Sequence, residues 1–202
     1  MVYSLINKYR FDLLMHFIWT MRGFAMRLMA AAFLFLLGAG MASASGAPQV
    51  VSAQVFLATD AVHAGQTARI AVVAHIQPGY HINDHKPSLD YLIPTRVVFQ
   101  DSPVLKVESI VYPRGKSMKF DFLDSPISVY EGEVRLESIL KVDRTAKPGT
   151  YSLSGKFMYQ ACNDHACLAP TSVPLEVKIR VVPASVPLKA ANSEVFKTIS
   201  SR

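Results

Sequence analysis

The chain is poor in cysteine, with only Cys162 and Cys167 among its 202 residues. A structural zinc site needs more ligands than two thiols supply. Four residues separate the cysteines, whereas a thioredoxin-type pair has two between them. The spacing therefore leaves two interpretations open, an inert disulfide staple or a working redox pair.

Long runs of positive charge and recognisable nucleic-acid motifs are also lacking. Residues 1–44 contain Lys8, Arg10, Arg22, Arg27 and Asp12. Without them, the 21 basic and 15 acidic residues become 17 and 14, a net charge of +3. This is an ordinary soluble surface, and we expect no nucleic-acid partner.

No apolar run is long enough for a confident membrane span, but the amino terminus has the pattern of a secretory signal peptide. Positive charge in residues 21–27 precedes an apolar stretch over 28–37, and Ala42-Ser-Ala44 forms a small-residue cleavage site. We expect a leader over residues 1–44, with translation starting at Met21 or Met26 rather than including 1–20. The remaining chain would be exported to the periplasm without stable insertion in the membrane.

An exported protein meets an oxidising compartment, where nearby thiols form disulfides. Closing the short loop between Cys162 and Cys167 stabilises a fold by only about 2 kcal/mol in the loop-entropy picture. A mature chain of roughly 158 residues can bury a core without staples. Positions five apart point in different directions on a helix, so we expect the pair at a turn or hairpin tip.

The mature chain has the pattern of an all-β protein. Short apolar runs with period-two alternation are separated by turns rich in proline and glycine, most clearly over residues 133–142, 151–159 and 175–181. Seven or eight such strands predict an antiparallel β-sandwich. Residues 45–182 are expected to form this domain, followed by a flexible tail over residues 183–202 that starts with a proline-containing linker.

Five motifs occur in a distinctive order along residues 78–170. They are PGYHINDHKP at 78–87, DYLIPT at 90–95, YPRGK at 112–116, VYEGEV at 129–134 and YQACNDHACLAP at 159–170. In this order they resemble the amino-terminal domain of the DsbD family of thiol:disulfide interchange proteins. The resemblance covers roughly residues 50–182, and the cysteine segment is its most specific part.

The resemblance implies an immunoglobulin-like antiparallel sandwich of about seven to nine strands. It also implies a periplasmic protein-disulfide reductase or interchange activity that passes electrons from a membrane thiol reductase, or a thioredoxin-like protein, to disulfide proteins and cytochrome-maturation factors. Cys162 and Cys167 would form the catalytic disulfide, with Cys167 facing the partner and Cys162 resolving. No metal or organic cofactor is required by this chemistry.

The segment over residues 118–126 contains two aromatic side chains, Phe120 and Phe122, in otherwise polar surroundings. By resemblance it corresponds to a cap loop that shields the cysteines until a partner docks, with Phe122 as the first choice for the shielding ring and Phe120 as the second. The alternative is a loop fixed to the core by its aromatics, because apolar loop residues need something to cover.

Three further side chains are candidates for tuning the thiols: Asp164 and His165 between the cysteines, and His81 upstream. A protonated histidine beside a thiolate lowers the thiol pKa, and a carboxylate raises it or binds the imidazole. The alternative for Asp164 and His165 is a pair of solvated turn residues. His81 and His85 are not expected to bind a metal, because Pro78, Gly79 and Pro87 predict a loop.

Two other classes of function remain open from the residues. One is a non-catalytic binding or assembly module whose disulfide only fixes a loop. The other is a copper-handling protein that uses the two thiols and a nearby histidine, since soft ligands suit Cu(I).

Overall fold

The computed structural model describes residues 48–100, 102–120 and 124–197. The expected leader and Phe122 lie outside these ranges. The regular structure within them is made of strands, as predicted from the alternating pattern. Among the described residues no helix is long and apolar enough to cross a membrane.

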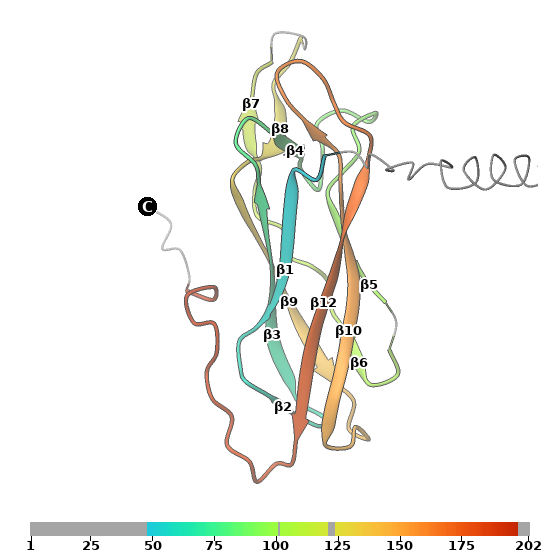
Figure 1. The fold of residues 1–202 in the computed structure, drawn as a ribbon, viewed down its shortest axis with the longest axis vertical. Helices are drawn as coiled ribbons and strands as arrows, with labels where there is room; N and C mark the ends of the chain where they lie inside the picture. Colours follow the sequence, from blue (N-terminus) through green and yellow to red (C-terminus); the bar gives the residue numbers. More distant parts are fainter. Residues whose placement is uncertain (1–47, 101, 121–123, 198–202) are drawn as a thin grey trace, which may run out of the picture. The chain divides into compact units, whose positions relative to one another are not determined.

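The strands form three sheets, two of which pack face to face around one core (Figure 1). The first sheet has the order β1 (Val51–Leu57), β3 (Thr67–Ile76), β9 (Glu133–Val142) and β6 (Leu105–Val107). The second has the order β2 (Val62–His63), β12 (Thr171–Val182), β10 (Gly149–Tyr159) and β5 (Arg96–Phe99). The third and smallest has the order β11 (Ala161–Cys162), β4 (His81–Asn83), β8 (Ile127–Tyr130) and β7 (Lys116–Met118).

The two large sheets confirm the prediction of an immunoglobulin-like antiparallel sandwich. Their eight strands lie within the expected range, and only the short β2–β12 pair is parallel. The small sheet adds four strands that the alternation did not predict, since each of them spans only two to four residues.

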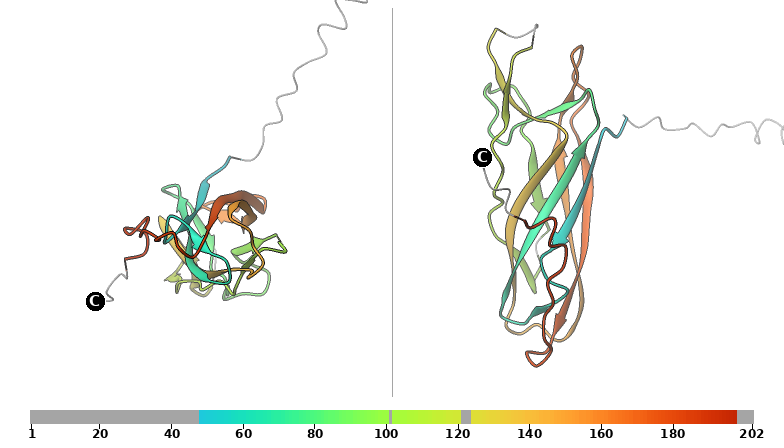
Figure 2. Two further views of the ribbon diagram at one scale, coloured as in Figure 1. Left: turned by 90° about the horizontal axis from the view of Figure 1, so that it is seen from below. Right: turned by 90° about the vertical axis from the view of Figure 1, so that its left-hand side faces the viewer.

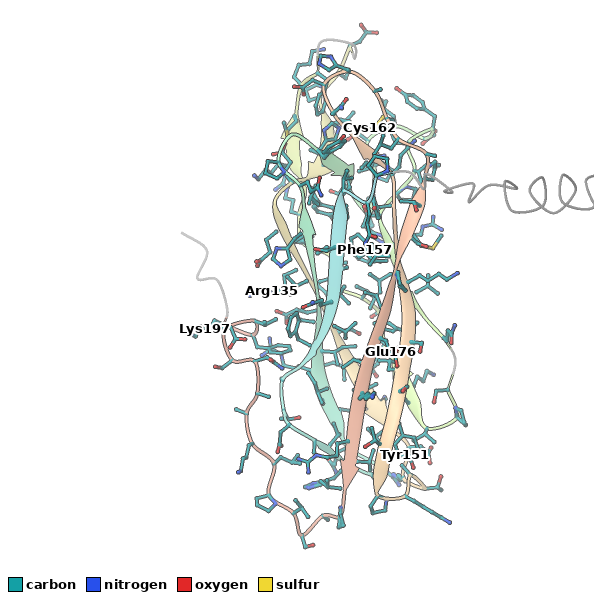
Figure 3. The ribbon with its side chains drawn as sticks, in the orientation of Figure 1. Arg135, Tyr151, Phe157, Cys162, Glu176 and Lys197 are labelled. Carbon is teal, nitrogen blue, oxygen red and sulfur yellow. A yellow bond between two sulfur atoms is a disulfide. The ribbon has the colours of Figure 1, made fainter. Side chains whose placement is uncertain are left out.

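Period-two alternation explains how each long strand contributes to the core. In β10, Leu153, Phe157 and Tyr159 are almost fully buried, while Lys156 and Met158 between them are exposed. Figure 3 shows Phe157 between the end of the sandwich that carries Cys162 and the end that carries Tyr151. The strand that anchors the core therefore leads directly to the cysteine segment.

Strand β9 keeps the same alternation along its whole length, as predicted from its sequence. Ser138 occupies an inward position between Leu136 and Leu140. Its Oγ donates toward two backbone carbonyls, Glu108 O at 3.0 Å and Ser109 O at 3.2 Å. A buried hydroxyl is tolerated when it is hydrogen-bonded, so this serine completes the inward row despite its polarity.

The later part of the segment where we expected a flexible tail, residues 189–197, lies against the outside of the first sheet (Figure 2). Backbone hydrogen bonds join Asp60 N to Lys189 O and Ala191 N to Ala58 O, both at 2.9 Å. Val195 is buried against Ala71 and Val73 on the outer face of β3. The prolines of this segment prevent continuous strand pairing but leave it free to dock through single contacts.

Candidate functional site

The two cysteines face each other across a tight hairpin that follows β10. Cys162 ends β11, and Cys167 lies opposite it as an isolated antiparallel bridge. A disulfide joins them, with 2.01 Å between the sulfur atoms and 3.9 Å between the Cα atoms. The hairpin lies at the end of the sandwich that also carries β4, β7 and β8 (Figures 1 and 3).

Asn163 shapes the turn between the cysteines. Its Oδ1 accepts hydrogen bonds from the backbone N–H groups of His165 and Ala166, both at 2.9 Å. Its own N–H donates to Ala166 O at 3.0 Å. Asparagine commonly folds a turn in this way. The turn was expected from the spacing of the cysteines, but the role of Asn163 in it was not predicted.

The base of the hairpin is fixed by two further hydrogen bonds. Leu168 N donates to Ala161 O at 2.8 Å, and the Gln160 Nε2 amide donates to Leu168 O at 3.2 Å. These two bonds join the chain on both sides of the cysteines without involving the sulfur atoms. Asp164 and His165 are exposed at the tip.

The two cysteines differ strongly in exposure. Cys162 is only 3% exposed, whereas Cys167 is an exposed residue. Access controls thiol exchange together with thiolate fraction. Cys167 is therefore the more accessible residue of the pair to a thiol from another molecule.

The two faces of the small sheet pack in different apolar clusters, because successive side chains of a strand point to opposite sides. Ala161, Ile82 and Tyr130 belong to the main core of the sandwich. On the other face, Val129 and Phe120 belong to a separate apolar cluster. This second cluster, which we call the outer cluster, contains Phe120, Ile127, Val129, Leu89, Leu92 and Met118.

His81 lies on the same face of the small sheet as Cys162. The register places His81 directly opposite Cys162, and Ile82 opposite Ala161. His81 is 4% exposed, and its ring stacks on Phe120 with 4.4 Å between centroids and 28° between planes. Burial lowers the pKa of His81, against the opposing effect of the carboxylates of Glu131 and Asp164.

Phe120 supports both interpretations that the sequence left open. It is 6% exposed and packed in the outer cluster, as a residue that fixes its loop would be. It also covers the imidazole that is the cross-strand neighbour of Cys162. Phe122, the first choice for the shielding ring, remains a prediction outside the described residues.

Asp84 connects the segments that surround the site. Its Oδ2 accepts hydrogen bonds from Ser128 Oγ at 2.6 Å and Gly115 N at 3.2 Å, and its Oδ1 accepts from Lys86 N at 3.2 Å. Tyr130 Oη lies 2.7 Å from Oδ1 and donates to it. Burial raises the pKa of Asp84, but hydrogen bonds led by those from Ser128 and Tyr130 outweigh it, and the pKa is lowered overall.

His85 has a different environment from His81. Its ring stacks on Tyr112 at 3.7 Å with 4° between the planes, and its Nδ1 lies 3.2 Å from Thr95 O. Among the described residues, no three histidine, cysteine or acidic side chains are grouped to hold a metal ion. The structure thus brings together Cys162, Cys167, His81 and Phe120, with Asp164 acting on His81 through its charge.

Fold and site together define an immunoglobulin-like domain that carries a disulfide hairpin at one end. Residues 48–178 match the family described as thiol:disulfide interchange protein DsbD, N-terminal. The chain belongs to this family. A comparison with curated proteins finds no match.

Solved structures similar to this chain include three domains with related descriptions. The N-terminal periplasmic domain of ScsB from Proteus mirabilis is 15% identical, with a TM-score of 0.41 over 66% of this chain and 47% of that one. The reduced DsbD N-terminal domain of Neisseria meningitidis is 15% identical, with a TM-score of 0.38 over 61% of this chain and 86% of that one. The complex of the DsbD and PilB N-terminal domains from the same organism shows 14% identity and a TM-score of 0.35, over 60% and 80%. The chain thus spans about half of the ScsB chain that it matches.

Proposed function

We propose that this chain is a periplasmic thiol–disulfide exchange module that passes electrons from a membrane or thioredoxin-like thiol reductase to the disulfides of partner proteins. The observation that carries the proposal is the hairpin disulfide with one exposed and one buried cysteine. Membership in the DsbD amino-terminal family supports the same activity.

The reaction would proceed by two exchanges at each partner. A donor thiolate attacks Cys167 Sγ, the Cys162–Cys167 bond breaks, and Cys162 leaves as a thiolate that takes up a proton. The second donor thiol then attacks the mixed disulfide and leaves this chain as a dithiol and the donor as a disulfide. In the second half, the Cys167 thiolate attacks an acceptor disulfide, and Cys162 resolves the mixed disulfide while the acceptor keeps two electrons as a dithiol.

Trapping in cells tests this function and the order of the cysteines. With Cys162→Ser, the remaining Cys167 thiol should accumulate as a mixed disulfide with a partner, because the resolving thiol is gone. Cys167→Ser should trap far less, since Cys162 is buried. The measurement is non-reducing electrophoresis after acid quenching and alkylation, with mass spectrometry of the captured protein.

The double serine variant is the control for adducts that do not involve these cysteines. Wild-type protein should be partly reduced when the membrane reductase is present and fully oxidised when it is deleted. A pair that stays oxidised in both strains, with no adduct from either single variant, would contradict the relay and leave a structural disulfide.

The periplasmic location is part of the proposal, and processing tests it. We expect the mature chain to begin near Ser45, because small residues at Ala42 and Ala44 suit cleavage by signal peptidase. Amino-terminal sequencing of the protein from a periplasmic extract gives the answer. Mature protein that retains residues 21–37 would indicate an anchored protein instead.

A further inference from the structure

The outer face of the small sheet arranges three side chains in a layer beside the disulfide: Phe120, His81 and Cys162. Directly opposed residues of an antiparallel pair have Cβ atoms about 4.5–5.5 Å apart on the same face. This spacing brings the imidazole of His81 within reach of Cys162 Sγ once the disulfide opens and the sulfur can rotate. One flat side of the imidazole is covered by the ring of Phe120.

Cys162 needs a proton acceptor more than Cys167 does. The thiolate, not the thiol, attacks a disulfide, and burial among apolar groups raises a thiol pKa. Cys162 is 3% exposed, so bulk water has poor access to its proton. Cys167 is exposed and can lose its proton to solvent.

We propose that His81 is the proton acceptor for Cys162 when Cys162 resolves a mixed disulfide held on Cys167. The proposal rests on the exchange function above and assigns one residue in it a chemical role. His81 takes the thiol proton, the Cys162 thiolate attacks Cys167 Sγ, and the Cys162–Cys167 bond forms. The bond from Cys167 to the partner sulfur breaks, and the partner leaves as a thiolate that is protonated by solvent.

In the opposite direction the same atoms reverse their roles. When a donor thiolate attacks Cys167, Cys162 leaves as a thiolate and takes a proton from the His81 imidazolium, which His81 has first taken up from solvent. No oxidant or reductant is needed beyond the partner thiols and disulfides. One imidazole thus serves both halves of the relay.

The surroundings of His81 suit this role. Burial lowers the pKa of His81 and so favours the neutral imidazole, which is the form that accepts a proton. Among the described residues, the charges that act on it are the carboxylates of Glu131 and Asp164, and both favour the imidazolium once it forms. Glu131 is in turn paired with Lys116, with 3.7 Å between the charged atoms.

The test measures the reactions of the two cysteines separately. It uses a small disulfide, 5,5′-dithiobis(2-nitrobenzoate), in place of a protein partner. In the reduced protein, Cys167 attacks the disulfide of the reagent and releases one coloured thiolate. Cys162 then attacks the mixed disulfide on Cys167 and releases the second. Stopped-flow absorbance records both phases across about pH 5 to 9, the range that brackets histidine and cysteine titration. Because this assay needs no protein partner, its result does not depend on whether the protein passes electrons to partners in cells.

We expect His81→Gln to slow the second phase about 100-fold at neutral pH, the usual size of a lost proton transfer. Its pH profile should shift upward to that of the unassisted thiol, while the first phase stays unchanged. His81→Phe keeps a flat ring against Phe120 but cannot accept a proton, so it should behave like His81→Gln. The matched control is His85→Gln, whose ring stacks on Tyr112 instead, and it should retain the wild-type profile.

A wild-type second phase in both His81 variants would overturn the proposal. If either variant fails to fold, the wild-type protein still decides the question. Its second phase should show an inflection at the pKa of His81 measured by NMR on the Cys162→Ser variant. A profile without that inflection would also exclude His81 as the acceptor.

Discussion

Replacing both Cys162 and Cys167 by serine should abolish electron transfer to any partner disulfide and leave the sandwich folded. The loop closed by the disulfide is short, so the bond stabilises the fold by only about 2 kcal/mol in the loop-entropy picture. The hairpin keeps its other restraints, which are the Asn163 turn and the hydrogen bond from Leu168 N to Ala161 O. The core of the two large sheets does not depend on the sulfur atoms.

Circular dichroism and thermal melting measure the folding half of this prediction. Insulin reduction coupled to a thiol donor measures the exchange half. The control is the wild-type protein held reduced, which lacks the bond but keeps both thiols, and its melting temperature should match that of the double variant. Global unfolding of the double variant at room temperature would favour the structural-staple interpretation.

Phe120→Ala should open the site at the small sheet and increase the reactivity of the buried thiol. Phe120 is 6% exposed and stacks on His81, so its truncation removes the ring that covers the cross-strand neighbour of Cys162. Phenylalanine-to-alanine changes in packed sites cost about 3 kcal/mol or more. If that loss is local, it corresponds to an increase of about 100-fold in the population of open states.

Alkylation of the reduced protein, read for each cysteine by mass spectrometry, tests this prediction. Cys162 should react about 100-fold faster in Phe120→Ala, in proportion to the open population, while exposed Cys167 changes little. Phe196→Ala is the control, since Phe196 packs beside Arg69 on the outer face of the first sheet, away from the disulfide. Phe122→Ala tests the first choice from the sequence in the same assay. Unchanged rates in both Phe120→Ala and Phe122→Ala, with the fold intact, would show that residues 118–126 do not shield the pair.

The sandwich could be predicted from the sequence because its long strands repeat the same alternation many times. Strand β10 is a clear case, with Leu153, Phe157 and Tyr159 all pointing inward. The small sheet could not be predicted in this way. A strand as short as β11 or β4 shows no period, and its partners come from distant parts of the chain.

The cysteines could be found from composition and spacing, but their surroundings could not. Nothing local to Asp84 shows that Ser128 and Tyr130, which follow it by 44 and 46 residues, donate to its carboxylate. His81 likewise looks like a loop histidine until its register opposite Cys162 is known. Both features depend on tertiary pairing, which propensity and spacing do not encode.

The alternation of β4 has a consequence for how this domain can change over evolutionary time. His81 lies on the face of the small sheet that carries Cys162, while the next residue, Ile82, is fully buried in the main core. Inserting or deleting one residue before them would exchange the two faces, placing an imidazole in the sandwich and an aliphatic chain beside the sulfur. Substitutions at position 81 can therefore change the surroundings of Cys162 while the packing of the main core is kept. A change in length at the same place would disturb the core and the surroundings of the disulfide together, so lineages of this domain should diverge here by substitution rather than by insertion or deletion.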